Sequence, residues 1–190
     1  MTLSSLIIVV VIALLVVIAF AVLGTYNGLV GKRNKIKEAF STIDVMLKKR
    51  YDLIPNMVAT AKQYMTHEGE TLTRIAGLRA RAMDPSVPMD ERVKADNELM
   101  QGVRGLMVQV EAYPDLKANE NFMDLQRTLS ELENQLSGAR RTFNSSVLEM
   151  NNAVEMFPSN IVAAMFNFKR HEMFEIPEAE RVNPDVKSLF

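Results

Sequence analysis

The chain has 190 residues, with 22 Lys+Arg against 23 Asp+Glu, and it contains no cysteine. The lack of cysteine excludes disulfides, cysteine-ligated zinc, iron–sulfur clusters and thiol catalysis, and the balanced charge argues against a basic nucleic-acid-binding domain. The charge is unevenly distributed, because every Asp, Glu, Lys, Arg and His lies after residue 31.

The first expected element is a membrane-spanning helix within residues 1–25. Residues 6–23 form an unbroken apolar run, which as a helix is about 27 Å long, close to the ~30 Å hydrocarbon core of a bilayer. A cleavable signal peptide is the alternative, and Ala19-Phe20-Ala21 resembles a cleavage site. Signal peptides usually have a basic N-terminal region and a shorter apolar core, whereas residues 1–5 lack Lys and Arg. We therefore expect an uncleaved, single-pass anchor.

A basic cluster, defined as Lys32, Arg33, Lys35 and Lys37, follows the anchor directly. By the positive-inside rule, this cluster predicts a short N-terminus outside the membrane and a C-terminal bundle in the cytoplasm. The same four residues are candidate contacts for anionic lipid headgroups, which contribute about 1 kcal/mol per charge near the surface. The lipid bilayer is therefore an expected partner. A salt bridge at the rim of the bundle is the alternative role for these cations.

Two glycines mark the inner end of the anchor. Gly24 and Gly28 are four residues apart, a spacing at which small residues let two membrane helices approach closely. They are candidate helix-packing glycines, in agreement with a homo-oligomer. A flexible neck between anchor and body is the alternative interpretation.

The body, residues 26–170, is expected to be helical throughout. A stripe at steps of three and four residues predicts a first helix, and it comprises Tyr26, Leu29, Ile36, Phe40, Ile43, Leu47 and Ile54. Pro55 predicts a kink or break at residues 52–56, because proline cannot donate to the helical ladder. Further helices are expected over residues 57–64, 70–83 and 89–112, separated by a corner at 66–69 and a proline-containing loop at 84–88.

The strongest helical pattern lies in residues 118–157. An apolar side chain recurs there every seven residues, at Phe122, Leu129, Leu136, Phe143, Met150 and Phe157. Such a coiled-coil-like seam has to be buried, and short connections favour folding back over a self-associating rod. We therefore expect an all-α protein, with a transmembrane helix followed by a long antiparallel bundle of three to four helices. Residues 171–190 are expected to be a tail that is ordered only if it docks.

Two cations interrupt the apolar stripe of the first helix. Arg33 and Arg50 occupy stripe positions, and a cation on an apolar face must reach solvent or find a carboxylate. The candidate partners are Asp44, Asp52, Glu149 and Glu155. We expect buried or rim ion pairs among these residues.

Several motifs together resemble those of the LemA family, over about residues 6–166. The longest is Ile43-Asp44-Val45-x-Leu47-Lys48-x-Arg50-x-Asp52-Leu53-Ile54-Pro55-Asn56. Shorter matches are Tyr26-Asn27-Gly28-Leu29-Val30, Arg33-Asn34, His67-Glu68, Glu111-Ala112-Tyr113-Pro114, Leu125-Gln126 and Phe157-Pro158. Phe143 and Met150 depart from the family pattern, which often has Tyr before the asparagines retained at positions 144 and 151. The resemblance implies a bacterial inner-membrane protein with one N-terminal membrane helix, a cytoplasmic helical bundle and no established enzymatic activity.

Motifs for catalysis, cofactors and metals are missing from the sequence. His67-Glu68 and His171-Glu172 lack the second histidine of H-E-x-x-H, and neither G-x-S-x-G nor a Gly-rich nucleotide loop occurs. We therefore assign no catalytic, cofactor-binding or metal-binding residue. We expect a non-enzymatic, membrane-anchored scaffold that self-assembles or holds another membrane protein, with no nucleic-acid partner. An accessory subunit of a membrane protease or envelope-stress system is the alternative.

Overall fold

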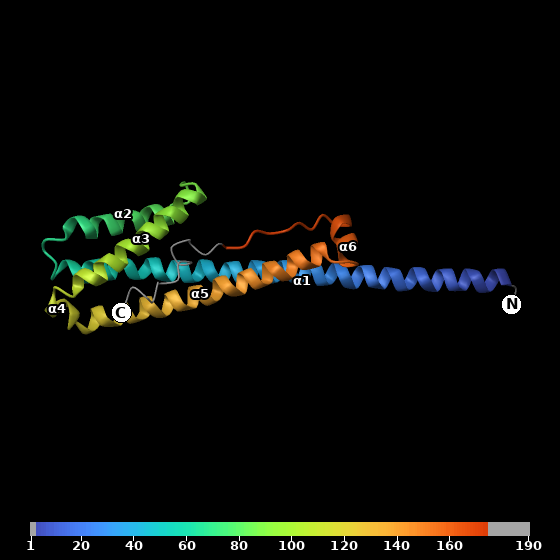
Figure 1. The fold of residues 1–190 in the computed structure, drawn as a ribbon, viewed down its shortest axis with the longest axis horizontal. Coiled ribbons are helices and arrows are strands. Elements are labelled where there is room, and N and C mark those ends of the chain that lie inside the picture. The colour runs from blue at the N-terminus through green and yellow to red at the C-terminus, as the bar shows by residue number, and fades with distance from the viewer. Residues whose placement is uncertain (1–2, 175–190) are drawn as a thin grey trace, which may run out of the picture. The chain divides into compact units, whose positions relative to one another are not determined.

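The computed structural model describes residues 3–174, and all of its regular elements in that range are helices. They are α1 Leu3–Lys62, α2 Gly69–Met83, α3 Met89–Val110, α4 Pro114–Lys117, α5 Glu120–Glu155 and α6 Ser159–Met165 (Figure 1). The predicted all-α fold is confirmed. The chain divides into two compact units. We call Ile43–Gly138 the head unit, and the chain up to Thr42 and from Ala139 onward the anchor unit.

The apolar N-terminal run forms the first part of α1. It is long and apolar enough to cross a membrane, and none of its most apolar 18-residue window is buried against the protein. A soluble core helix would bury such a surface, because exposing it to water costs about 25 cal/mol per Å². The structure therefore contains one candidate membrane span in the residues it describes.

Helix α1 does not end at Pro55, so of the kink or break predicted there, the break is wrong. The helix includes this proline and continues to Lys62. Pro55 has no N–H to donate to the carbonyl of Tyr51, four residues earlier, which leaves a buried acceptor. The Nε of Arg79 in α2 donates to that carbonyl at 2.6 Å. Tertiary structure thus replaces the hydrogen bond that proline removes.

The head unit is a bundle in which each long helix runs antiparallel to the next (Figure 1). It combines the end of α1 with α2, α3, the short α4 and the first half of α5. Its core contains Ile54, Met57, Ile75, Leu99 and Phe122, all nearly inaccessible to solvent. A Cβ added at Gly102 would lie 3.2 Å from the side chain of Ile75, so α2 and α3 pack closely there. Asn119 begins α5 as its N-cap, because its Oδ1 accepts the N–H of Phe122 at 2.9 Å.

The predicted seam of α5 is buried along most of its length. Phe122, Leu129, Leu136, Phe143 and Met150 are all buried. Phe157 was expected to continue this row, and that expectation is wrong, because the residue is 79% exposed. The helix ends at Glu155, so the seven-residue periodicity no longer sets the direction of the following side chains.

The anchor unit combines α1 up to Thr42 with the second half of α5, followed by α6. After α6, residues 166–174 return alongside α5 (Figure 1); we call this segment the strap. The strap includes the first four residues of the expected tail, 171–174, and the rest of that tail, residues 175–190, lies outside the described residues.

Candidate functional site

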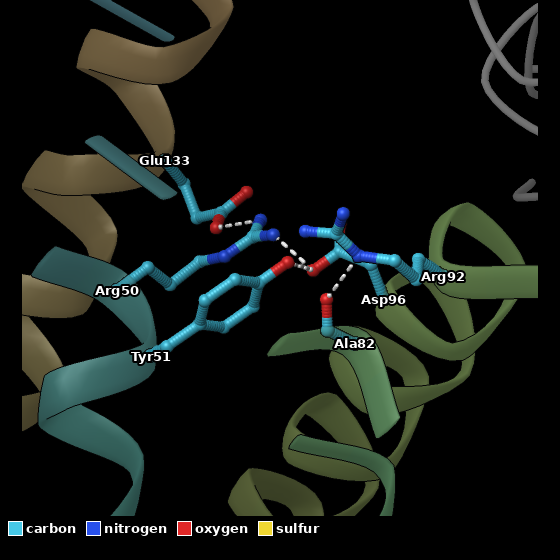
Figure 2. A network of polar contacts seen from close by, with 6 residues as sticks. All are labelled: Arg50, Tyr51, Ala82, Arg92, Asp96 and Glu133. Carbon is cyan, nitrogen blue, oxygen red and sulfur yellow. Dashed lines mark hydrogen bonds and ion pairs between the residues drawn. The ribbon is translucent and has the colours of Figure 1, made fainter. Parts of the chain in front are cut away.

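A buried ion cluster lies in the head unit (Figure 2). Arg50 of α1 is only 2% exposed, and its guanidinium donates to Asp96 of α3 and, at 2.8 Å, to Glu133 of α5. The Tyr51 hydroxyl donates to the same Asp96 oxygen at 2.9 Å. Nearby, the Nε of Arg92 donates to the carbonyl of Ala82, which joins α3 to the end of α2.

Burial and charge shape the protonation of this cluster. Burial alone lowers the pKa of Arg50, but the neighbouring carboxylates of Asp96 and Glu133 raise it well above its usual range. Burial, followed by the negative charge of Asp96, raises the pKa of Tyr51 to about 12. The arginine is therefore a permanent cation and the phenol a permanent donor at neutral pH. Neither group is suited to proton transfer there, so the geometry supports a role in fixing three helices together.

The carboxylates that pair with Arg50 are not those expected in α1. Asp52 pairs instead with Lys48 at 3.0 Å, on the exposed side of the helix. Asp44 and Asp52 are six residues before and two residues after Arg50, and at 100° per residue neither lies on its face. A sequence signal for Asp96 existed, because it lies three residues after Val93 and four before Met100, in the apolar row of α3. A carboxylate on one apolar stripe is the natural complement of an arginine on another.

The basic cluster lies in the anchor unit and has several kinds of partner. Lys32 and Lys35 share Glu149 of α5, at 3.5 and 3.7 Å. Arg33 was expected to form an ion pair, but its guanidinium lies 5.5 Å from the centre of the Phe168 ring. Such a cation–π contact contributes about 0.5–1 kcal/mol at an exposed site. Lys37 has no ion pair within residues 3–174.

The candidate helix-packing glycines have free space around them. A Cβ added at Gly24 or Gly28 meets no atom within 4 Å in the described chain. Neither glycine is therefore required for packing among residues 3–174. That leaves contact with another helix, or chain flexibility, as the reason for small residues at these positions.

Two asparagines of α5 hold the strap through its backbone. The Asn151 amide donates to the carbonyl of His171 at 3.0 Å and accepts its N–H at 2.9 Å. The Asn144 amide makes the same pair of bonds with Phe174, at 3.0 and 2.8 Å. The spacings match, because seven residues of helix advance about 10.5 Å and three residues of extended chain about 10 Å. We call these two amides the asparagine ladder. All four of their hydrogen bonds go to backbone atoms of an extended segment, so they do not depend on the side chains of that segment.

Aromatic side chains of the strap also pack against rings of α1 and α5. Phe174 packs on Phe143 with ring centres 4.8 Å apart, and Phe168 packs on Tyr26 at 5.8 Å. Arg170 pairs with Glu155 of α5 at 2.9 Å. Sequence reasoning noted the asparagines at 144 and 151 but assigned them no role. Their seven-residue spacing beside a buried seam was the available signal.

The described residues offer little that resembles a catalytic centre. No group of three or more His, Asp or Glu side chains within residues 3–174 could hold a metal ion. A hollow between α2 and α3 is lined by Leu78, Arg81, Glu91, Lys94, Ala95 and Glu98. A second hollow, between α1 and α5, is lined by neutral polar and apolar side chains together with Asp124. Neither of these two linings contains a histidine or a serine.

Comparison with known proteins agrees with the motifs. The sequence model described as "LemA family" matches residues 39–188. The chain is 28% identical over 171 residues to Protein LemA of Metamycoplasma hominis, covering 90% of this chain and 78% of that protein. It is 22% identical over 190 residues to magnetosome protein MamQ of Magnetospirillum gryphiswaldense, covering 86% of this chain and 70% of that protein. With a family model matched over most of its length, the chain belongs to the LemA family.

Proposed function

We propose that this protein is a non-enzymatic scaffold, anchored in the bacterial inner membrane by the first part of α1. Copies assemble when the strap of one copy binds to α5 of a second copy in place of that copy's own strap. The N-terminus lies outside and the bundle lies in the cytoplasm, in keeping with the basic cluster after the anchor. The observation that carries the proposal is the asparagine ladder, in which Asn144 and Asn151 hold an extended segment by four backbone hydrogen bonds.

Exchange of the strap between copies needs no new contacts. The same hydrogen bonds and ring contacts form whether the strap comes from its own chain or from a neighbour, as in domain swapping. Asn167, the second residue of the strap, has a φ of 56° in the left-handed region, a conformation that is uncommon outside glycine. Membrane anchoring confines copies near one another, which raises the effective concentration for exchange.

A complementation experiment tests this function. A copy ending at residue 165 has an empty strap site, and a tagged full-length copy should retain it when the two are co-expressed and purified in mild detergent. Asn144→Ala with Asn151→Ala in the shortened copy removes four hydrogen bonds. At about 1 kcal/mol each, their loss should weaken the affinity of the two copies roughly a thousandfold. Asn152→Ala, an exposed neighbour in α5, is the matched control and should change nothing.

Two outcomes would contradict assembly through the strap. Retention that survives the double substitution would show that assembly does not use the asparagine ladder. Loss of all self-capture, with steady co-purification of a different membrane protein, would replace the scaffold by the accessory-subunit alternative. Far-UV circular dichroism of the shortened copy checks that its helices are intact.

A further inference from the structure

An exposed apolar corner forms where the chain turns from α5 into α6 and on to the strap. We define the corner as Met156, Phe157, Ile161, Met165 and Phe166, whose side chains are between 49% and 79% exposed. Isolated exposed apolar residues are ordinary, but five large ones within residues 156–166 indicate a surface that is covered in use.

The corner lies beside the inner end of the candidate membrane span. The ring of Phe166 is 4.6 Å from that of Tyr26, measured between centres. Tyr26 is three residues beyond Leu23, the last residue of the apolar run, which is about 4.5 Å along a helix. All of these residues belong to the anchor unit, and α6 lies next to α1 at this level (Figure 1).

The composition of the corner fits a lipid surface. Residues 156–168 contain no charged side chain, and Lys169 and Arg170 follow immediately. Glu155 precedes the segment and pairs with Arg170, which leaves Lys169 as the cation able to reach lipid phosphates, and aromatic and apolar side chains next to such a cation are typical of segments that lie in the membrane interface.

We propose that the corner is a second membrane contact, which enters the headgroup–acyl boundary of the leaflet that α1 leaves. This inference rests on the proposed anchoring of α1. Its depth is limited by the turns at either end of α6, because non-helical backbone must keep hydrogen-bond partners and therefore stays in the hydrated interface. Two contacts, α1 and the corner, fix both the tilt and the rotation of the anchor unit at the bilayer, which one helix alone leaves free.

The absence of cysteine makes the test direct, because any introduced cysteine is the single labelling site. The full-length protein is reconstituted in vesicles of phosphatidylcholine and phosphatidylglycerol, and an environment-sensitive fluorophore is attached at Phe157→Cys or at Met165→Cys. Phe20→Cys in the anchor is the lipid-exposed reference, and Leu148→Cys, a half-exposed position on α5, is the matched aqueous control.

We expect the labels at positions 157 and 165 to emit several-fold more strongly than the label at 148. Lipids with a quencher high on the acyl chain should quench them, whereas lipids with a quencher near the chain end should quench position 20 most. If positions 157 and 165 instead behave like position 148 while position 20 stays in lipid, the corner proposal is overturned and the anchoring stands. If position 20 is also aqueous, the anchoring itself is wrong. Bright labels that no lipid quenches would show a protein-covered corner, which likewise overturns the proposal.

Discussion

Replacing Arg50 by Met should destabilise the head unit strongly, because it removes the only cation of the buried ion cluster. Asp96, whose side chain is 13% exposed, would keep the Tyr51 hydroxyl as its one hydrogen-bond partner among the residues that the structure describes. Glu133 is 33% exposed and can regain water. Removing one partner of a buried ion pair costs about 3–5 kcal/mol. Since one of the two carboxylates can rehydrate, we expect a loss at the lower end, about 3 kcal/mol.

The assay is thermal unfolding of the full-length protein in detergent, followed by circular dichroism at 222 nm. In a cooperative unit of roughly 100 residues, 1 kcal/mol shifts Tm by about 4–8 °C, so Arg50→Met should lower Tm by about 12–24 °C. Arg127→Met is the matched control, because Arg127 pairs with Asp124 on the same helix α5 but both side chains are about two-thirds exposed. Its effect should stay within about 1 kcal/mol.

A double substitution separates an electrostatic loss from a simple packing loss. Arg50→Met combined with Asp96→Asn removes both charges of the most buried pair, so the two changes should cost about 1–3 kcal/mol less together than the sum of their separate costs. Additive costs would refute the stated reasoning, and so would an Arg50→Met protein no less stable than Arg127→Met.

Three further predictions concern the phenol, the anchor and the topology. Because the pKa of Tyr51 is raised from 10.0 to about 12, the stability it contributes is complete below pH 10 and is lost as pH rises from 10 to 12. Between pH 9 and pH 12, the Tyr51→Phe protein should therefore lose about 2–3 kcal/mol less unfolding free energy than the wild-type protein. Urea unfolding at the two pH values measures this difference. The same loss in both proteins would contradict a raised pKa of Tyr51. Gly24→Ile with Gly28→Ile should lower the oligomer mass in detergent without changing helix content, because each new Cβ meets open space; an unchanged mass would favour the flexible neck. A reporter fused after Phe190 should be active in the cytoplasm, and activity only on the other side would reverse the orientation.

Local periodicity allowed much of the fold to be predicted from the sequence. The seam of α5 repeats every seven residues, and burying such a surface is the dominant favourable contribution to folding. The apolar run of residues 6–23 was recognisable by its unbroken length, which suits a bilayer. Helix ends were less certain, because they depend on partners distant in the chain. At Pro55 the helix continues since Arg79 supplies a donor, and no neighbour in sequence indicates this.

By itself, the sequence determined that the protein is helical and that it has one apolar span followed by a charged body. Both properties follow from side-chain type and spacing, which act over a few residues. Only the tertiary structure decided which carboxylates neutralise Arg50, that Arg33 meets an aromatic ring, and that Asn144 and Asn151 hold the strap. These pairings join residues from distant parts of the chain. Hydrogen bonds and ion pairs act only at contact distance, so the fold must first bring their partners together.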